Sequence, residues 1–542
     1  MSKKVFYADE AREKVLAGAK ILADAVKTTM GPKGRNVVIA KSYGGPTVTH
    51  DGVTVAESID LPETIENLGE KVGADLIKQA AKKMNKTQGD GTTTVTVLTY
   101  EILREANKLI AAGYNPMDLR KGIESAGQEI LADLAKLSEP ISGDSQKIAE
   151  VATISAGDSE LGKLIAGVIA KIGADGVISV EESQGLETTS EITEGFTIDR
   201  GYVSAYMATD ATRMEAAYNN PAILITDKKI SNVNEFLPIL EQLSAAGKKD
   251  LVLIADEVEG EALGVLILNR LKGVFNTVAI KAPSFGDKRK DVLEDIAILT
   301  GATVVSADAG MNFDNVSLEV LGSARKVIVG KDTTTIIEGA GEKANIANRI
   351  AQIREIAKSA PSDFDRDQLN KRAADLGGKV AVIKVGGATE TEINEKKFRV
   401  DDAVAATKAA LAGGIVAGGG TTPLELSRTF AKKHTNLDAG SEILVNALKK
   451  PFVQLMDNAG LNSAALLDRA ESAKSGFGFD VRGDGKDLIE LKKSGIIDPA
   501  NVTHDAIETA VSIAATAITM GALVVDVPEP KAPAAPDMGG MY

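Results

Sequence analysis

The sequence predicts a multidomain protein, in which a mainly α-helical domain and a small α+β linker domain are both split around one continuous α/β domain. A chain of 542 residues is too long for a single hydrophobic core. Apolar residues recur at helical spacing in both end segments, residues 8–136 and 418–527. Between Gly195 and Gly378, short apolar strand candidates alternate with helical stretches, which is the pattern of an α/β domain.

The first segment is expected to begin with a long helix. Asp9 is a candidate N-cap, and Gly31-Pro32 ends the helix. Its apolar positions follow one helical face: Val15, Ala19, Leu22 and Val26. A β-hairpin is expected next, because valines flank Asp51-Gly52, a favoured turn dipeptide. Two further helical runs follow, at residues 67–83 and 95–111.

The pattern changes near Pro140. A helical pair is expected at residues 148–172 and a strand at 176–180. Strands of the inserted domain are predicted at residues 222–225, 251–255, 277–280, 303–306 and 326–329. A strand at 380–385 then precedes a long helix at 392–412. Paired breaks on the outgoing and returning chain are the hinge candidates: Pro140, Gly195, Gly377-Gly378 and Gly413-Gly414.

Composition excludes several classes of function. A net charge of −14 and a pI of about 5.0 argue against nucleic acid and anionic membranes as partners. The absence of cysteine excludes disulfides and thiolate catalysis. His50, His434 and His504 lie far apart in the sequence, so no metal-binding histidine cluster is expected. The first residues are charged and no apolar run could span a bilayer, which favours a cytoplasmic protein.

The segment from Gly89 to Thr94, GDGTTT, is the most informative motif. Backbone N–H groups at a helix start favour an anion, and a carboxylate is a natural ligand for Mg²⁺. A phosphate and Mg²⁺ site is therefore one interpretation, with Asp90 on the metal. Ordinary helix capping by Asp and Thr is the other. No GxxxxGK[ST] motif occurs, so a nucleotide site here is not a P-loop.

Three further segments complete the pattern: TTMGPKGRN from Thr28, RVDDA from Arg399, and AGGG from Ala417. With these segments the whole sequence resembles the group I chaperonins, the GroEL type. The resemblance extends from about Lys4 to Pro528. It includes TTMGPKGRNVV, DGVTVA, GDGTTT, DRGY, ADEVEGEAL, KAPSFGD, KDTTTIIEG, KVAVIKVGGATE, EKKFRVDDA and VAGGG.

The resemblance implies the chaperonin fold with three domains. The mainly helical equatorial domain would comprise residues 1–136 and 413–527. The α+β intermediate domain would comprise residues 137–194 and 379–412, and the α/β apical domain residues 195–378. The Pro/Ala/Gly-rich tail, residues 528–542, is expected to be disordered.

The resemblance also implies an ATPase that uses ATP, Mg²⁺ and K⁺. Asp90 would bind Mg²⁺. Asp402 would position or activate the attacking water, and Asp51 would assist it. The nucleotide would be bound by Thr29, Met30, Gly31, Pro32, Asp90, Gly91, Thr92, Thr93, Thr94, Gly419, Asp480 and Asp498. From the residues alone, Asp51 could instead be a turn residue and Asp402 part of a solvated helix face.

The sequence departs from the family at four places. His50 replaces a common lysine, which leaves a backbone carbonyl as the K⁺ ligand there. Asp480-Val481-Arg482 replaces an Asn-Ala-Ala adenine loop, and Lys379 replaces a hinge glycine. The usual Gly-Gly-Met repeats shrink to Met538–Met541, written MGGM.

Residues 257–271 carry apolar side chains on nearly every helical face, which indicates either full burial or an exposed binding surface. By resemblance, the apolar positions that hold non-native chains and the co-chaperonin are Tyr202, Tyr206, Met207, Leu237, Leu240, Leu263, Ile267 and Leu268. Simple core packing is the alternative for each of them.

The function predicted is that of an ATP-driven chaperone. It would capture non-native polypeptides and enclose them in a cavity of two stacked heptameric rings, a tetradecamer closed by a GroES-type co-chaperonin. A group II chaperonin with a built-in lid is the first alternative, although no extended insertion lies between Leu243 and Lys288. A small-molecule phosphotransferase is the second.

Overall fold

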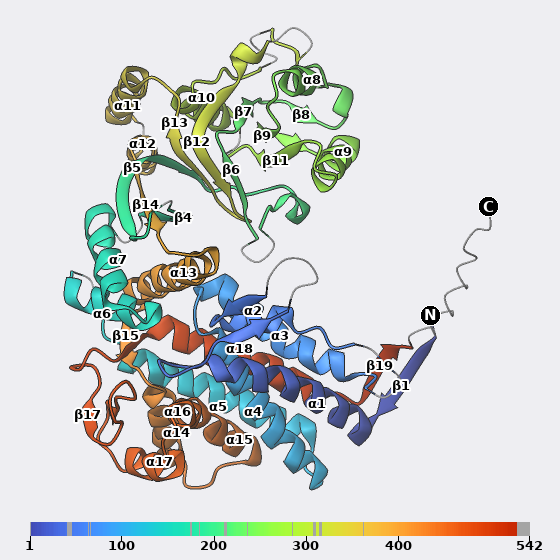
Figure 1. Ribbon diagram of the computed structural model, residues 1–542, viewed down its shortest axis with the longest axis vertical. Coiled ribbons are helices and arrows are strands. Elements are labelled where there is room, and N and C mark those ends of the chain that lie inside the picture. Colours follow the sequence, from blue (N-terminus) through green and yellow to red (C-terminus); the bar gives the residue numbers. More distant parts are fainter. Residues whose placement is uncertain are drawn as a thin grey trace. The chain divides into compact units, whose positions relative to one another are not determined.

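The computed structural model describes residues 2–40, 46–62, 64, 67–141, 143–173, 176–183, 185–210, 214–235, 237–284, 286–306, 310–313, 317–360 and 362–527. The chain forms two compact units (Figure 1). The first comprises Met1–Ala174, Val180–Thr189 and Lys384–Tyr542, and the second Asp175–Ser179 and Ser190–Ile383. Within the described residues, no helix is long and apolar enough to cross a membrane.

The first unit is mainly helical, as the end segments of the sequence predict. Its helices before the second unit are α1 (Ala8–Val26), α2 (Gly52–Ser58), α3 (Glu70–Gln88), α4 (Thr92–Ala111), α5 (Pro116–Leu137), α6 (Ser145–Ala156) and α7 (Ser159–Ile172). Those after it are α13 (Glu390–Gly413), α14 (Thr421–Lys433), α15 (Ala439–Ala447), α16 (Lys450–Asn458), α17 (Ser463–Glu471) and α18 (Ala500–Ala517).

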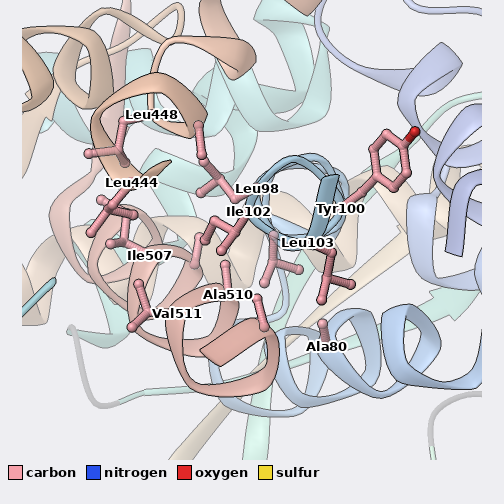
Figure 2. Packing of buried hydrophobic residues seen from close by; sticks show 14 of the residues in the cluster. Ala80, Leu98, Tyr100, Ile102, Leu103, Leu444, Leu448, Ile507, Ala510 and Val511 are labelled. Carbon is pink, nitrogen blue, oxygen red and sulfur yellow. The ribbon is translucent and has the colours of Figure 1, made fainter. Parts of the chain in front are cut away.

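Helix α4 lies in the centre of this unit, packed against α3, α15 and α18. Leu98, Ile102 and Leu103 of α4 are buried in one apolar cluster with Ile507 and Ala510 of α18 (Figure 2). The core therefore joins residues some 400 positions apart in the sequence. This packing fixes α4 relative to α18, which follows the second unit in the sequence.

Short two-stranded sheets complete the unit. β1 (Lys3–Tyr7) pairs antiparallel with β19 (Ala522–Asp526), which joins the two ends of the described chain. The other pairs are β2 (Val37–Ile39) with β3 (Thr47–Thr49), β15 (Ile415–Ala417) with β18 (Ile497–Pro499), and β16 (Phe477–Phe479) with β17 (Leu488–Glu490).

The second unit is an α/β structure around a mixed sheet in the order β11-β9-β7-β12-β13-β5. Its strands are β5 (Thr189–Ile198), β6 (Ala216–Asn219), β7 (Ala222–Ile225), β8 (Lys229–Ile230), β9 (Asp250–Ala255), β10 (Glu257–Val258), β11 (Asn276–Lys281), β12 (Gly322–Val329) and β13 (Thr334–Gly339). β7, β9 and β11 are parallel, and β12, β13 and β5 are antiparallel. Its helices are α8 (Leu237–Ala245), α9 (Gly260–Leu271), α10 (Asp287–Thr300), α11 (Lys343–Lys358) and α12 (Asp363–Leu376).

The chain passes between the units along β4 (Val177–Glu182) and β14 (Lys379–Val385). The helices of the predicted intermediate domain, α6, α7 and α13, pack on one another within the first unit. The division into equatorial, intermediate and apical domains and the four hinge positions stay predictions. The predicted disordered tail lies outside the described residues.

Three local predictions are wrong. Tyr7, not Asp9, is the N-cap of α1, and Asp9 lies in the first turn beside Arg12. No hairpin forms at Asp51-Gly52, because the Asp51 carboxylate caps α2 there. Residues 303–306 form no strand, since Val305 makes only an isolated bridge to Thr226. Two long strands, β5 and β13, were not predicted.

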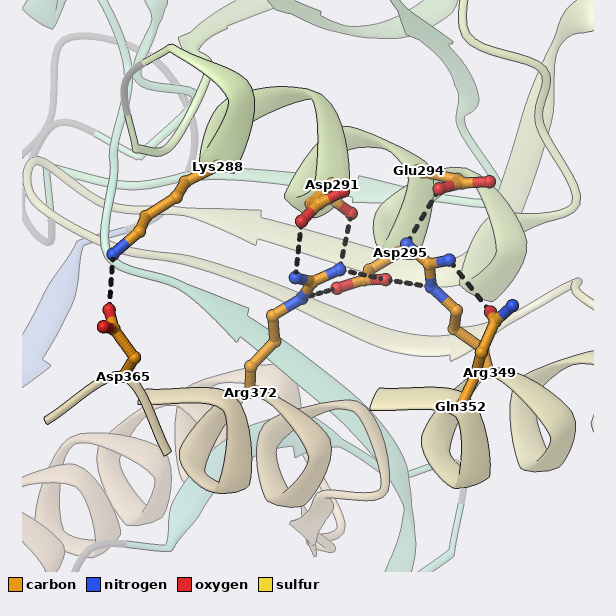
Figure 3. A network of polar contacts seen from close by, with 8 residues as sticks. All are labelled: Lys288, Asp291, Glu294, Asp295, Arg349, Gln352, Asp365 and Arg372. Carbon is orange, nitrogen blue, oxygen red and sulfur yellow. Dashed lines mark hydrogen bonds and ion pairs between the residues drawn. The ribbon is translucent and has the colours of Figure 1, made fainter. Parts of the chain in front are cut away.

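A buried ion-pair network joins α10 to α11 and α12 (Figure 3). The Asp295 side chain is 1% exposed and accepts from Arg349 Nε at 2.7 Å and from Arg372 Nη2 at 3.0 Å. Both arginines also reach exposed acids on α10, since Arg349 contacts Glu294 and Arg372 contacts Asp291. Asp295 is thus the buried centre of the network.

We expect Asp295→Ala to destabilise the protein by about 3–5 kcal/mol, because it leaves two arginines without their buried partner. Denaturant unfolding followed by circular dichroism measures the loss. Glu294→Ala is the matched control, since it removes a 56%-exposed partner of the same Arg349 and should cost about 0–1 kcal/mol. Equal effects of the two substitutions would contradict the assignment of Asp295 as the centre.

Candidate functional site

All fourteen residues predicted to bind or hydrolyse a nucleotide line one cavity of about 610 Å³ in the first unit. They come from segments at both ends of the chain: Thr29, Met30, Gly31, Pro32, Asp51, Asp90, Gly91, Thr92, Thr93, Thr94, Asp402, Gly419, Asp480 and Asp498. The sequence therefore predicts correctly which residues meet. Their chemical roles stay predictions.

Two helix N-termini border the cavity. Gly91 is the N-cap of α4 and Gly420 the N-cap of α14, and neither helix start has a side-chain cap. Their first N–H groups are thus available to an anion, which the helix dipole also favours. Gly91 has φ +78°, and a Cβ there would lie 2.7 Å from Val502 Cγ1, so the close packing of α4 on α18 requires glycine.

Hydroxyl groups gather at the same place. Thr93 Oγ1 lies 3.1 Å from Thr29 Oγ1, which links the start of α4 to the turn after α1. A Cβ on Gly52 would meet Thr93 Oγ1 at 2.5 Å, so the start of α2 also approaches this hydroxyl closely. Three chain segments thus converge on the threonines of the GDGTTT motif.

Two carboxyl groups are held beside these donors. Burial raises the pKa of Asp90, although hydrogen bonds from Gly91 N–H and Ser155 Oγ act in the opposite direction. Burial, together with the neighbouring Asp90, raises the pKa of Asp498 to about 7. The β15–β18 ladder sets Asp498 opposite Val416 and beside Gly418. Two neighbouring acids whose pKa values are both raised form a natural site for a cation.

Asp51 is a helix cap that also lines the cavity. Its carboxylate accepts from Val53 N–H at 3.1 Å and from Thr54 N–H at 2.9 Å. Its charge is close enough to raise the pKa of Asp90. The structure thus makes Asp51 a helix cap and not the turn residue of the alternative interpretation, in addition to its place in the cavity.

Helix α13 contributes Glu395, Arg399 and Asp402 to the lining. These residues lie four and three positions apart and therefore share one helical face. Arg399 forms an ion pair with Glu395, and Asp402 is half-buried. The same face that presents Asp402 to the cavity thus also presents one cation and a second acid.

His50 lies in the lining beside this face. Burial lowers its pKa, and the positive charge of Arg399 lowers it further. The imidazole is therefore neutral at pH 7. A lysine at this position would bring a positive charge that His50 does not supply.

The remaining lining is apolar. Met30, Leu455, Met456, Phe479 and Val481 belong to one buried cluster and line the cavity. This apolar part adjoins Asp480, whose carboxylate accepts from Arg482 N–H at 3.0 Å and Arg482 Nε at 3.1 Å. Burial acts to raise the pKa of Asp480, but these hydrogen bonds outweigh it, and the pKa lies below its usual range.

The sequence assigns no role in the site to several lining residues: Thr153, Ser155, Glu395, Phe398, Arg399 and Arg482. Ser155 lies in α6 without a glycine motif, so no local signal marked it. Arg399 and Glu395 could have been found, because they share a helical face with Asp402.

His504, Asp505 and Glu508 of α18 also form a group whose ligating atoms lie within 4.8 Å, where none was expected. Asp505 accepts from Gln88 there, at 2.6 Å.

The sequence model of the TCP-1/cpn60 chaperonin family matches residues 22–528. The chain belongs to this family. It is a chaperonin, with a role in protein folding, polypeptides as substrates and assembly of its subunits into rings. The multidomain chaperonin fold predicted from the sequence is confirmed.

The chaperonin's second unit contains the residues predicted to capture polypeptides. The structure buries Tyr202, Met207 and Leu240 in its hydrophobic core, which favours core packing, the alternative interpretation, for these three residues. The others remain accessible to different degrees. Tyr206, Leu237 and Leu268 are exposed by 69%, 37% and 55%, whereas Leu263 and Ile267 are half-buried against the core.

We expect the free energy of unfolding of the chaperonin without nucleotide to fall as the pH rises from about 4 to 7, because of Asp498. Its pKa is near 3.8 when unfolded and about 7 when folded, so only the folded chain holds the proton in this interval. Asp498→Asn should remove this slope and raise stability at pH 8 by roughly 1–4 kcal/mol. Unfolding of the variant measured at several pH values, with the exposed Asp484→Asn as control, checks this. An Asp498→Asn profile parallel to that of the parent would contradict the pair of neighbouring acids.

Proposed function

We propose that this chaperonin is of group I and couples Mg²⁺-dependent ATP hydrolysis to protein folding. The observation that supports this most is the cavity of the first unit. It combines two helix N-termini without side-chain caps, a pair of neighbouring half-buried acids and an apolar lining. The helix N-termini suit phosphates, the acids suit a hard cation, and the apolar lining suits the adenine ring. Members of the family are ATPases.

Different residues of the cavity would bind different parts of Mg²⁺-ATP. The N–H groups after Gly91 and Gly420 and the hydroxyls of Thr92 to Thr94 would hold phosphate oxygens. Asp90, with Asp498 nearby, would hold Mg²⁺, which neutralises charge that develops on the phosphates. Thr29 to Pro32, Gly419 and Asp480 would hold the rest of the nucleotide, and a backbone carbonyl near His50 would bind K⁺.

Asp402 would hold and orient the attacking water, with assistance from Asp51. A carboxylate on a helix can be withdrawn or advanced as one body, which would link hydrolysis to a conformational step. Asp51 is less free to move, because it caps α2. Asp402 is therefore the stronger candidate for the general base that activates the attacking water.

The assembly we propose is two stacked heptameric rings closed by a separate co-chaperonin. The chain between α8 and α10 supports this over a built-in lid. Its described residues are accounted for by β9, β10, α9 and β11 with short connections, which leaves no long insertion. Electron microscopy of the purified protein tests the ring and its co-chaperonin cap.

Asp402→Ala should leave nucleotide binding and ring assembly intact but slow ATP hydrolysis by roughly 10²–10⁴-fold. Single-turnover hydrolysis and nucleotide titration separate the two effects. Asp401→Ala is the matched control on the neighbouring position of α13. Turnover near that of the parent in Asp402→Ala would remove the residue from the mechanism.

Leu268→Glu should abolish capture of an unfolded protein while stability changes by no more than about 0.5 kcal/mol, because Leu268 is 55% exposed. Leu240→Glu is the contrast, since a charge buried in the core should unfold the second unit. Light scattering of an aggregating client and thermal unfolding report the two properties. Intact capture by Leu268→Glu would contradict the proposed surface.

A further inference from the structure

A short turn after α1 forms one side of the cavity in the first unit. It consists of the 3₁₀ helix η1 (Lys27–Thr29) and the residue that follows, and it brings Thr29 and Met30 into the lining. Thr29 Oγ1 lies 3.1 Å from Thr93 Oγ1, whereas Met30 belongs to the buried apolar cluster of the lining. The turn therefore reaches from the hydroxyl side of the cavity to its apolar side, and its position affects both.

Asn458, the last residue of α16, holds both ends of this turn. Its side-chain Nδ2 donates to the Lys27 carbonyl and to the Met30 carbonyl, each at 2.9 Å. Gln454, one helical turn earlier, donates from Nε2 to Asn458 Oδ1 at 2.8 Å. Backbone carbonyls only accept hydrogen bonds, so the Asn458 amide must direct its NH₂ group at the turn and its oxygen at Gln454. The two carbonyls thus determine the orientation of both side-chain amides.

A second contact brings the same helix against the loop that continues from the turn. Gly31 has φ +80°, and a Cβ there would lie 2.1 Å from Leu455 Cδ2. Leu455 and Asn458 are three positions apart and share one helical face, which supplies both the apolar contact and the amide. Because the two acceptor carbonyls of the turn are three residues apart in the sequence, the amide restrains the rotation of the turn as well as its distance from α16.

We propose that Asn458 is a positioning residue for the bound nucleotide. It keeps Thr29 beside Thr93 and keeps Met30 in the apolar lining, so the nucleotide meets surfaces that are already in place. Asn458 and Gln454 are themselves outside the described lining, so Asn458 acts through the turn and not by contact with the ligand. A turn that adopts its binding conformation only part of the time lowers the apparent affinity by that fraction. This inference rests on the proposed nucleotide site.

The test measures ADP binding to the assembled chaperonin by titration calorimetry with Mg²⁺ present, and steady-state ATP hydrolysis. Asn458→Ala removes both hydrogen bonds to the turn and should raise the Kd for ADP and the KM for ATP roughly 3- to 30-fold. The kcat should stay within about 2-fold of the parent, because a nucleotide that has bound restores the conformation of the turn. A lower kcat with unchanged Kd and KM would overturn the inference.

Asn458→Asp separates the hydrogen bonds from the shape of the side chain. Aspartate has the size of asparagine but no NH₂ group, and its carboxylate would face two carbonyl oxygens. The Kd for ADP should therefore rise at least as much as in Asn458→Ala. If Asn458→Asp binds ADP as tightly as the parent, the inference is wrong. Gln454→Leu removes only the group that orients the Asn458 amide, and it should raise the Kd by a smaller factor, roughly 2- to 5-fold.

Arg428→Ala is the matched control. Arg428 Nη1 also donates to backbone carbonyls, those of Ala470, Glu471 and Ala473, but the residue lies outside the described lining. The substitution should lower the melting temperature without raising the Kd for ADP. An equal rise of the Kd in Arg428→Ala and Asn458→Ala would attribute the effect to general stability and overturn the inference. If the parent binds neither ADP nor ATP, the proposed nucleotide site itself fails, and the inference fails with it.

Discussion

The position of Asp498 beside Asp90 constrains the rest of the cavity. Two half-buried carboxyl groups lie in one cavity with two helix N-termini, and burial raises the pKa of both acids. The fold tolerates this only because tight packing fixes the starts of α4 and α14 in place, through glycines that leave no room for a side chain. The proposed cation with bound phosphates would neutralise both acids. The two acids thus fit the proposed ligand site better than a role in stability.

Much of the site could be predicted from the sequence, because glycine-rich motifs determine backbone geometry locally. GDGTTT and AGGG both become helix starts with glycine caps. The hairpin predicted at Asp51-Gly52 was wrong, because the same dipeptide suits both a hairpin turn and a helix cap. The structure forms the cap, in which Val53 and Thr54 donate their N–H groups to the Asp51 carboxylate. Ser155 could not be found, because only tertiary packing of α6 brings it to Asp90.

The second unit was harder to predict for a different physical reason. Periodicity reports an apolar face only where polar residues mark the opposite face, and α9 has almost none. The structure buries Ala262 and Leu266 of this helix, and leaves Leu268 and Leu271 exposed. The excess of apolar residues thus divides into a core stripe and a surface stripe. Neither β5 nor β13 has the short apolar run by which β7, β9 and β11 were found.

Helix α13 connects the chemistry of the cavity to the chain that returns from the second unit. Glu395, Arg399 and Asp402 share its face, so a rotation of the helix as one body would move all three relative to Asp90. Its start follows β14 by four residues, two of which are Gly386 and Gly387. A few loop residues can absorb a large change in backbone angles, so the helix can turn as one body without an equal displacement of the strand.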